Sequence, residues 1–277
     1  MRIDLHTHSS VSDGTRPPAE VVRRAAAAGL DVVALTDHDT TRGWDEARAA
    51  LPPGLEFVPG IELSCALGGR SLHLLGYLFD PDDPALDAEL ARLQESRDGR
   101  GREMVARLRE LGSSVTVEQV ERIAAGARIG RPHIARAMVE AGTVASMDEA
   151  FTADWIGTDG RANVSRYALD PVEAIRLVRD AGGVSVLAHP RVRRGGYVFD
   201  DEVIGRLAAA GLDGVEVDHP GHEPDDRAAL RVLAARLGLA ATGSSDDHGE
   251  LSGDRIGCET TDPKAFERLV ARAGGAR

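Results

Sequence analysis

The sequence predicts an α/β protein in which a barrel-like ring of parallel strands carries one all-helical insertion. Seven short runs rich in leucine or β-branched residues recur along the 277-residue chain, and most of them precede segments with apolar residues at helical spacing. Such alternation is typical of parallel strands joined by crossover helices. The length agrees, because α/β barrels of about this size form a single domain.

The expected strands and helices follow one another along most of the chain. Pro171 suits a first helical turn, Asp170 is placed to cap it, and Gly182 follows the end of the same helix. Strands are expected within residues 2–8, 31–38, 55–64, 70–79, 183–190, 214–220 and 239–248, and helices over 17–28, 171–181, 201–210 and 224–237.

Residues 85–165 interrupt this alternation. They contain no convincing pair of strands, only helical patterns that begin with one long segment. We therefore expect a long helix that leads into a helical insertion over residues 98–165, with the barrel formed by residues 1–97 and 166–277.

The composition indicates a globular protein that does not coat nucleic acid. Hydrophobic residues make up 42% and charged residues 28% of the chain, as in ordinary globular domains. The net charge of −12 opposes non-specific binding to phosphate backbones but still allows a local phosphate site. No apolar run reaches the roughly 18 residues of a membrane span, and no signal peptide is visible. A cytoplasmic enzyme is expected, with no membrane association and no stable protein partner implied.

Histidines gather where the predicted strands end. Six of the nine lie at or just after such an end, and the carboxyl ends of barrel strands are where active sites form. Within "HTH", His6 and His8 point the same way because side chains alternate along a strand. The six are His6, His8, His38, His189, His219 and His248, while His73 lies within its strand.

Three carboxylates share this location: Asp13 after the first strand, Glu62 at the end of the third and Asp246 after the last. His, Asp and Glu without thiolates suit Zn, Mn or Fe in a catalytic site. A single histidine at a strand end is more often an ordinary polar residue with a hydrogen-bond partner. Six such histidines with carboxylates among them are harder to explain, because each one buried without a partner would cost about 1 to 3 kcal/mol. The neighbouring Asp4, Asp37, Asp39 and Asp247 could be supporting or capping groups rather than ligands.

Together these motifs resemble the polymerase and histidinol phosphatase (PHP) family of metal-dependent phosphoesterases. The resemblance rests on "HTHSSVSDG", "ALTDHDT", "GIELS", "HLLGY", "LAHP" and "SSDDHG", which span nearly the whole chain in order. It implies a distorted seven-stranded, TIM-like (β/α)7 barrel that binds two or three divalent ions, commonly Mn, Fe or Zn. The insertion with "GRPHIAR" and the run "DAGGVSVLAHP" resemble the branch that contains 3',5'-nucleotide bisphosphate phosphatases and 5'-3' exoribonucleases.

The resemblance also implies which residues bind the ions, and no ligand position is missing. One ion would be held by His6, His8, Glu62 and Asp246, a second by Glu62, His73 and His189, and a third by Asp13, His38 and His248. The residues expected to be catalytic are Asp13, Glu62, His189, Asp246 and His248.

The charge of such a site indicates its substrate. Three carboxylates with three divalent ions leave a net charge of about +3, which favours a polydentate anion such as a phosphoryl group. The resemblance to the bisphosphate phosphatase and exoribonuclease branch implies a hydrolase that releases phosphate from nucleotide monoesters such as pAp and AMP-like 5'-phosphates, and that could also act on the 5' ends of short RNA. The nucleophile would be a hydroxide that bridges two ions.

Four residues are predicted to contact the substrate. Arg131 and His133 lie at the start of a predicted helix, where a helix N-terminus favours anions and Arg offers a planar fork of donors. His222 and Arg193 follow strand ends and could reach a phosphate, as could Arg191, Arg194 and the arginine-rich stretch 97–109. The alternative for each of these is a capped or solvated surface residue, which is the usual role of a run of charges such as the other arginines.

Three other functions stay open on the sequence alone. The chain could be a different barrel metal hydrolase that cleaves C–N or C–O bonds. It could be a histidinol-phosphate phosphatase, which the insertion disfavours, or a non-catalytic metal-binding PHP module, which usually has lost ligands. Aromatic residues make up only 4% of the chain, which favours small substrates over long single strands.

Overall fold

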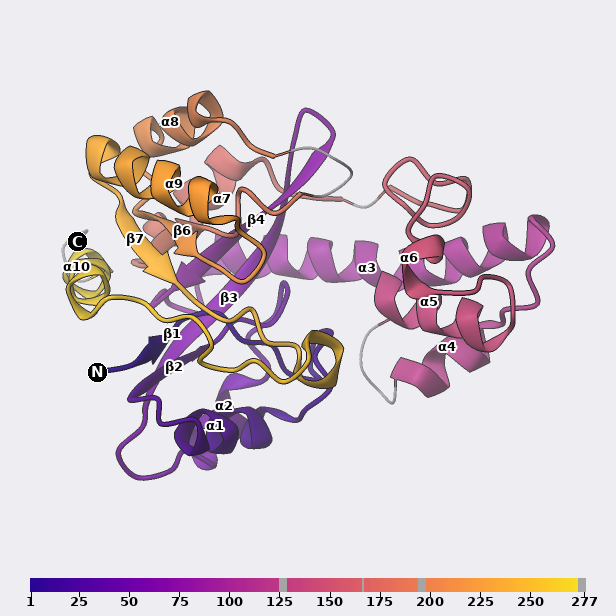
Figure 1. Cartoon of the computed structure of the whole chain (residues 1–277), viewed down its shortest axis with the longest axis horizontal. Helices are drawn as coiled ribbons and strands as arrows, with labels where there is room; N and C mark the ends of the chain where they lie inside the picture. The colour runs from indigo at the N-terminus through magenta and orange to yellow at the C-terminus, as the bar shows by residue number, and fades with distance from the viewer. Residues whose placement is uncertain (125–128, 166, 194–197, 274–277) are drawn as a thin grey trace. The chain divides into compact units, whose positions relative to one another are not determined.

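The computed structural model describes residues 1–124, 129–165, 167–193 and 198–273. The chain divides into two compact units (Figure 1). We call Met1–Leu90 with Ala168–Arg277 the barrel unit and Ala91–Tyr167 the helical unit.

The barrel unit is built on a seven-stranded sheet in which each strand pairs with its neighbour in sequence, from β1 to β7. The loops that follow β1 and β7 also touch, through a parallel bridge between Thr7 and Asp247, so the sheet is nearly closed into a barrel. All seven expected strands are present. They are β1 (Ile3–Asp4), β2 (Val32–Leu35), β3 (Glu56–Leu67), β4 (Arg70–Tyr77), β5 (Val184–Leu187), β6 (Gly214–Asp218) and β7 (Ala240–Gly243).

One expectation about the sheet is wrong, because β4 is antiparallel to both of its neighbours. Gly68 and Gly69, with φ of 57° and 76°, form a two-residue hairpin turn between β3 and β4. Consecutive positive φ angles are what such a turn requires, and glycine adopts them without strain. The reversal places His73, near the start of β4, opposite Ser64 at the end of β3. His73 therefore lies at the edge of the sheet where the parallel strands end.

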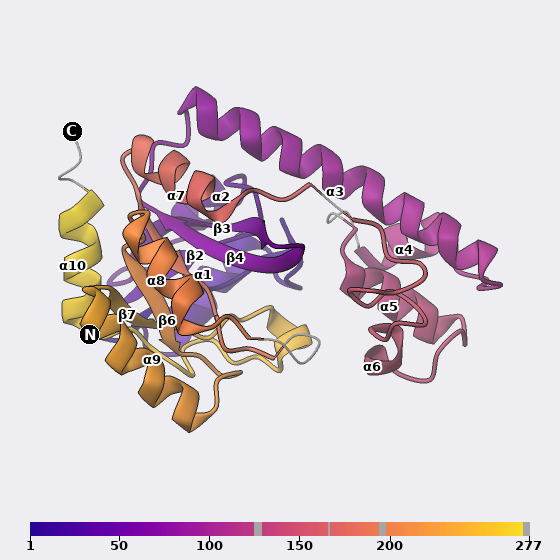
Figure 2. The same cartoon turned by 90° about the horizontal axis from the view of Figure 1, so that it is seen from above.

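Helices cover the outside of this sheet (Figure 2). Asp170 caps α7 as expected, since its carboxylate accepts the backbone N–H groups of Val172 and Glu173. Gly238 ends α9 with a φ of 69°, a left-handed conformation typical of a helix C-terminus. The helices are α1 (Pro18–Ala27), α2 (Trp44–Ala49), α7 (Pro171–Asp180), α8 (Asp201–Ala209), α9 (Pro224–Leu237) and α10 (Pro263–Ala273), with a 3-10 turn, η1, at Gly249–Ser252.

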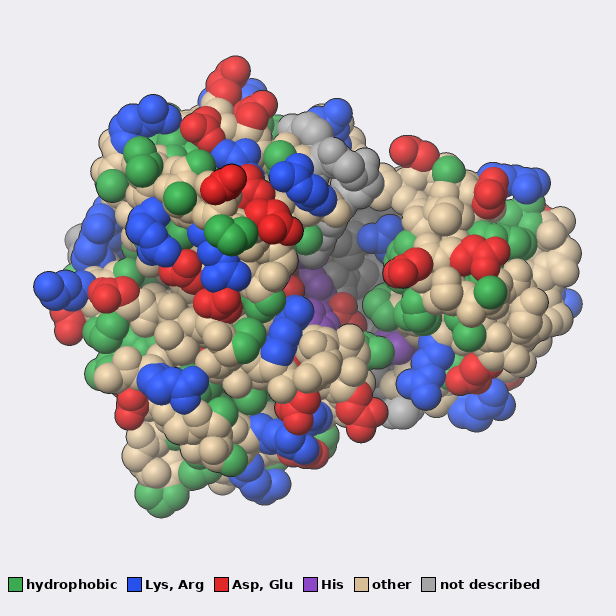
Figure 3. Space-filling view, viewed as in Figure 1, with side chains coloured by type: hydrophobic (Ala, Val, Ile, Leu, Met, Phe, Trp, Pro, Cys, Tyr) green, Lys and Arg blue, Asp and Glu red, His purple; other side chains and the backbone are tan. Residues whose placement is uncertain are grey.

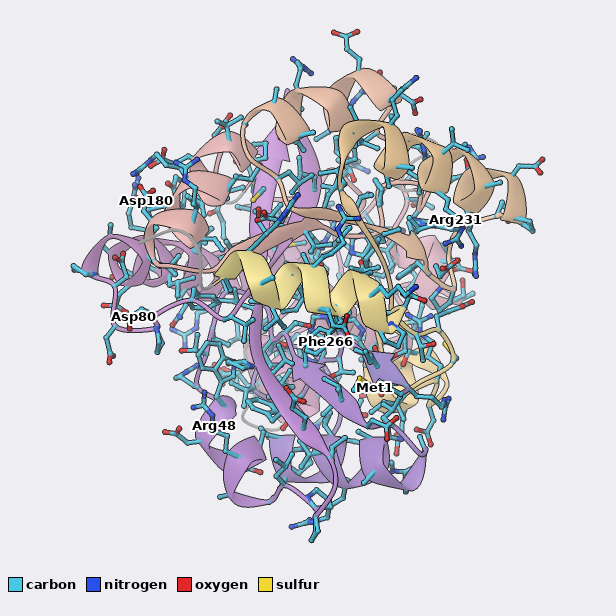
Figure 4. All side chains as sticks on the ribbon, turned by 90° about the vertical axis from the view of Figure 1, so that its left-hand side faces the viewer. Met1, Arg48, Asp80, Asp180, Arg231 and Phe266 are labelled. Carbon is cyan, nitrogen blue, oxygen red and sulfur yellow. The ribbon has the colours of Figure 1, made fainter. Side chains whose placement is uncertain are left out.

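An apolar core fills the amino-terminal end of the barrel. Ile3, Val32 and Val184, which begin their strands, pack with Phe266 and Leu269 of α10 in one buried cluster. Figure 4 views this end of the barrel, with α10 lying across it and Phe266 labelled. Burial of apolar side chains stabilises by about 25 cal/mol per Å². With α10 closing one end, polar side chains can converge only at the carboxyl ends of the strands.

The helical unit has an apolar core of its own. Met104 and Leu108 of the long helix α3 (Pro84–Glu110) pack with Val120 of α4 (Val117–Ala124) and with Ile134 and Met138. The last two lie on α5 (Arg131–Glu140), which is followed by the short helix α6 (Met147–Ala150). Among the described residues, no helix is both long and apolar enough to cross a membrane.

Candidate metal centre

The first strand delivers two buried imidazoles to one point. His6 and His8 follow β1, and their Nε2 atoms lie 3.0 Å apart. Both side chains have 0% exposure. Two ring nitrogens at this distance, with carboxylates beside them, match the arrangement of ligands around a cation.

Glu62 on β3 lies at the centre of the site, among five histidines. Its Oε1 lies 2.6 Å from His73 Nδ1 and 3.1 Å from His189 Nε2. Its Oε2 lies 3.1 to 3.2 Å from ring nitrogens of three further histidines, His6, His8 and His38. One buried carboxylate thus contacts five imidazoles from four segments of the chain. Histidine side chains also reach the surface beside acidic ones (Figure 3).

Among the residues that the structure describes, three groups of side chains could each hold a metal ion, because one ligand atom from every member lies within 4.8 Å of the others. We name them by one member each. The His6 group is His6, His8, Glu62 and Asp246; the Asp13 group is His8, Asp13, His38 and His248; and the His73 group is His38, Glu62 and His73. His189 reaches the last group through its contact with Glu62 Oε1.

Two of the candidate ligands have unusual backbone conformations. His189 and Asp246, which follow β5 and β7, have φ angles of 30° and 49°. Residues other than glycine adopt this region only when their surroundings hold them there, and such strain gathers at functional sites. His189 is held by its N–H, which donates to Glu216 Oε2 at 2.7 Å.

Aspartates beside the ligands tie neighbouring loops together. Asp37 accepts hydrogen bonds from the backbone and hydroxyl of Ser9 and from the hydroxyl of Ser12, at 2.6 to 2.8 Å. Asp39 accepts both the N–H and the hydroxyl of Ser64 at 2.7 Å. The hydrogen bonds from Ser9 and Ser12 to Asp37 fix the loop that carries Asp13.

Asp4 and Asp247 accept similar hydrogen bonds where β1 and its loop meet the segment after β7. Asp4 Oδ1 accepts from the N–H of Ser245, and its Oδ2 accepts from the N–H of Gly257. Asp247 accepts from Gly249 N–H and from Arg255 N–H. Among the described residues, these four aspartates lie outside the three groups. They position the backbone from which the ligands project.

Two residues without a predicted role, His219 and Arg255, hold Asp246 in place by hydrogen bonds. His219 Nδ1 accepts the N–H of Gly221 at 2.9 Å, so in the neutral ring Nε2 carries the proton and donates to Asp246 Oδ2 at 3.3 Å. Arg255 Nη2 donates to the carbonyl of Asp246 at 2.8 Å. His219 had a signal in its place at a strand end, whereas nothing in the sequence singled out Arg255.

The electrostatics of the site indicate that it suits cations. Burial alone would lower the pKa of His8, but Asp246 and Glu62 raise it to about 10. The pKa of His6 is also raised well above its usual value, by Asp246, Glu216 and Glu62 against the effect of burial. Burial opposes ionisation of Glu62 too, yet the surrounding histidines hold the pKa of that carboxyl well below its usual range. The buried carboxylates therefore require positive charge at the site, from protons or from metal ions.

We expect metal binding to release protons. At pH 7 the pKa of His8, raised to about 10, keeps a proton on this pair of histidines when no metal ion is bound, and a metal ion must displace that proton. Affinity should therefore rise with pH through the neutral range, by about tenfold per pH unit for each proton displaced. Calorimetric titration with Zn²⁺ in two buffers of different ionisation enthalpy measures this release. Identical heats in both buffers would contradict it.

The predicted contacts Arg131 and His133 lie at the first turn of α5, in the helical unit. His133 Nδ1 accepts the N–H of Gly130 at 3.1 Å, which caps the helix. The Arg131 guanidinium lies over the ring of Phe151, 5.7 Å from its centroid.

The other predicted substrate contacts lie in the barrel unit. Those that the structure describes form hydrogen bonds or ion pairs with other residues of this unit. His222 is buried, its Nδ1 donates to the carbonyl of Val217, and its Nε2 accepts the N–H of Arg191. Exposed Arg193 lies 3.5 Å from Asp226. The Arg191 guanidinium donates to Asp201 and to the carbonyl of Phe199, and Arg194 lies outside the described residues.

The sequence matches known proteins along most of its length. A family model described as "PHP domain" matches residues 4–117. The 3',5'-nucleoside bisphosphate phosphatase of Chromobacterium violaceum is 36% identical over 99% of this chain and 97% of the relative. The 5'-3' exoribonuclease of Haemophilus influenzae is 34% identical over 89% and 90%. The phosphoribosyl 1,2-cyclic phosphate 1,2-diphosphodiesterase of Eggerthella lenta is 32% identical over 89% and 94%.

Two solved structures resemble this one closely. A Bifidobacterium adolescentis protein assigned as a metal-dependent phosphoesterase superposes with a TM-score of 0.89 at 35% identity, over 98% of this chain and 96% of the other. A Chromobacterium violaceum protein described as an amidohydrolase with bound sulfate and no metal has a TM-score of 0.84 at 34% identity, over 98% and 97%. The likeness thus covers both the fold and the sequence.

Proposed function

Because this chain belongs to the PHP family of metal-dependent phosphoesterases, we propose that it removes phosphate from nucleotide monoesters, with 3',5'-bisphosphate nucleotides such as pAp as its principal substrates. The chain is a hydrolase of phosphoester bonds, as its relatives are. The observation that carries the proposal is the likeness over nearly the full length to a 3',5'-nucleoside bisphosphate phosphatase, combined with the three ligand groups.

The donors of the three groups fit divalent metal ions. They are imidazole nitrogens and carboxylate oxygens with no thiolate, and Glu62 belongs to two groups at once. We propose that two or three ions of Mn, Fe or Zn bind there. When bound, such ions acidify water and neutralise charge on a phosphoryl group. A relative of similar fold holds sulfate, a tetrahedral anion of phosphate shape.

The protein's own part in the reaction is to hold and orient. Asp13, Glu62 and Asp246 supply the negative charge that retains the ions, and the fixed loops keep these carboxylates in place. His189 Nε2 lies 3.1 Å from Glu62, and His248 Nε2 lies 3.4 Å from Asp13. These two histidines complete the proposed set of catalytic residues. Because these side chains are held rigidly, they need not be reordered at each turnover, and no free energy of reorganisation is added to the barrier.

Arg131 and His133 remain predicted phosphate contacts. Replacing Arg131 with Ala should lower kcat/KM for pAp about tenfold or more, because a charge-assisted hydrogen bond of roughly 1.5 to 3 kcal/mol is lost. Steady-state kinetics with pAp measure this, with Arg136→Ala on the exposed side of the same helix as a control. An unchanged kcat/KM for Arg131→Ala would remove this residue from the site.

The exoribonuclease relative supports a second candidate substrate, the 5' end of short RNA. One preparation of the metal-loaded protein should be assayed with pAp, AMP, a 5'-phosphorylated oligoribonucleotide and histidinol phosphate. We expect the highest kcat/KM with pAp. Turnover of the oligonucleotide alone would make the chain an exoribonuclease. Preference for histidinol phosphate would overturn the proposed substrate class.

A further inference from the structure

A buried glutamate on β6 contacts three of the strands that carry the proposed ligands. Glu216 has 0% exposure and lies in a strand whose flanking residues, Val215 and Val217, are buried as well. A carboxylate in such a place is costly unless every oxygen is satisfied. Both oxygens of Glu216 are satisfied, and each has a partner on a proposed metal ligand, His6 or His189.

Its two oxygens have separate partners. Oε1 lies 3.1 Å from His6 Nδ1 and also accepts the hydroxyl of Ser244, which follows β7. Oε2 accepts the backbone N–H of His189 at 2.7 Å. The strand ends of β1, β5 and β7 are therefore joined through one side chain.

A local irregularity in the sheet accompanies this placement. The register between β6 and β7 shifts between Glu216 and Asp218, where Glu216 pairs with Thr242 but Asp218 pairs with Gly243. Such bulges re-aim side chains and are common beside active sites. The bulge lies at the residue that reaches the ligands.

We propose that Glu216 is a positioning residue that prepares His6 and His189 to bind metal. A carboxylate can only accept a hydrogen bond, so the proton of the neutral His6 ring lies on Nδ1 and the lone pair of Nε2 faces the His6 group. His6 Nε2 lies 3.2 Å from Glu62 and 3.3 Å from Asp246. The bond to His189 N–H holds that residue in its left-handed conformation.

This role predicts a defined effect of Glu216→Gln. The amide nitrogen of glutamine cannot accept a hydrogen bond, so either the His6 ring proton or the His189 N–H loses its partner. Loss of such support typically weakens metal binding about 10- to 100-fold. The affinity of the metal-depleted protein for Zn²⁺ should fall by that factor, as measured by calorimetric titration. Glu259→Gln, a surface residue paired with Arg227, is the matched control and should bind as the wild type does.

A spectroscopic readout separates positioning from a loss of stability. In the Zn²⁺-loaded wild type, NMR should show the His6 ring proton on Nδ1, strongly downfield and protected from exchange, and Glu216→Gln should lose this signal. If Glu216→Gln does not fold by circular dichroism, Ser244→Ala decides the matter. This variant keeps the carboxylate but removes one of its donors, and it should weaken Zn²⁺ binding roughly two- to tenfold.

The inference rests on the proposed metal site, and the two can fail separately. A wild type that binds no Zn²⁺ would overturn the metal site itself. Wild-type affinity in folded Glu216→Gln, or in Ser244→Ala where Glu216→Gln does not fold, would overturn only the role of Glu216.

Discussion

Replacing Glu62 with Gln should abolish phosphatase activity and strip metal from more than one group. Glu62 contacts five histidines and belongs to both the His6 group and the His73 group. An amide carries no charge and offers one acceptor atom in place of two, so it cannot support two ions. Each ion supplies several kcal/mol of transition-state stabilisation, and kcat/KM should fall at least about a thousandfold.

Metal content and activity must be measured on the same preparation. We expect elemental analysis of Glu62→Gln to find at most one ion per chain, with pAp turnover near background. Glu56→Gln, on the exposed start of the same strand, should keep both properties. A Glu62→Gln variant that keeps its full metal content and activity would show that this carboxylate is not the shared ligand.

Replacing Asp13 with Ala should have a narrower effect. The Asp13 carboxylate lies 3.4 to 3.7 Å from ring nitrogens of His248, His38 and His8, and it belongs to the Asp13 group alone. We expect this variant to lose one ion and to keep those bound through Glu62. The loss of one ion should reduce kcat/KM about a hundredfold.

The comparison of the two variants tests how the site is divided. Asp45→Ala, at a fully exposed position on α2, provides the control for a lost aspartate. Full metal content in Asp13→Ala would contradict a separate ion at the Asp13 group. Loss of all metal would instead indicate that the groups bind ions only together.

The sequence predicted the seven strands because their cores are short apolar runs with clear boundaries. It did not predict the direction of β4. The turn that reverses the chain depends on two glycines with positive φ, and "GG" between apolar runs was the available signal. The spacing of histidines at strand ends indicated a cluster because a barrel collects its carboxyl ends. That reasoning needs only the topology, and it holds although His73 arrives from an antiparallel strand.

Residues that support the ligands could not be identified from the sequence in the same way. Glu216 lies between valines, and alternation along a strand would place it on a polar face. It is buried because both faces of β6 are covered. His222 was an equally open case, because its place after a strand end fitted a substrate contact or a loop residue alike, and in the structure backbone groups bind both of its ring nitrogens. Hydrogen bonds of this kind depend on the conformations of loops, which the spacing of apolar residues in the sequence does not predict.

The most direct test of the proposed activity is phosphate release before and after metal removal. The protein should be depleted with a chelator, shown by circular dichroism to be folded, and reloaded with Mn²⁺, Fe²⁺ or Zn²⁺ in separate samples. We predict that the depleted protein releases no phosphate from pAp and that at least one metal restores turnover in proportion to the ions bound. A fully loaded protein that releases no phosphate from pAp, AMP or 5'-phosphorylated RNA would contradict the proposed function.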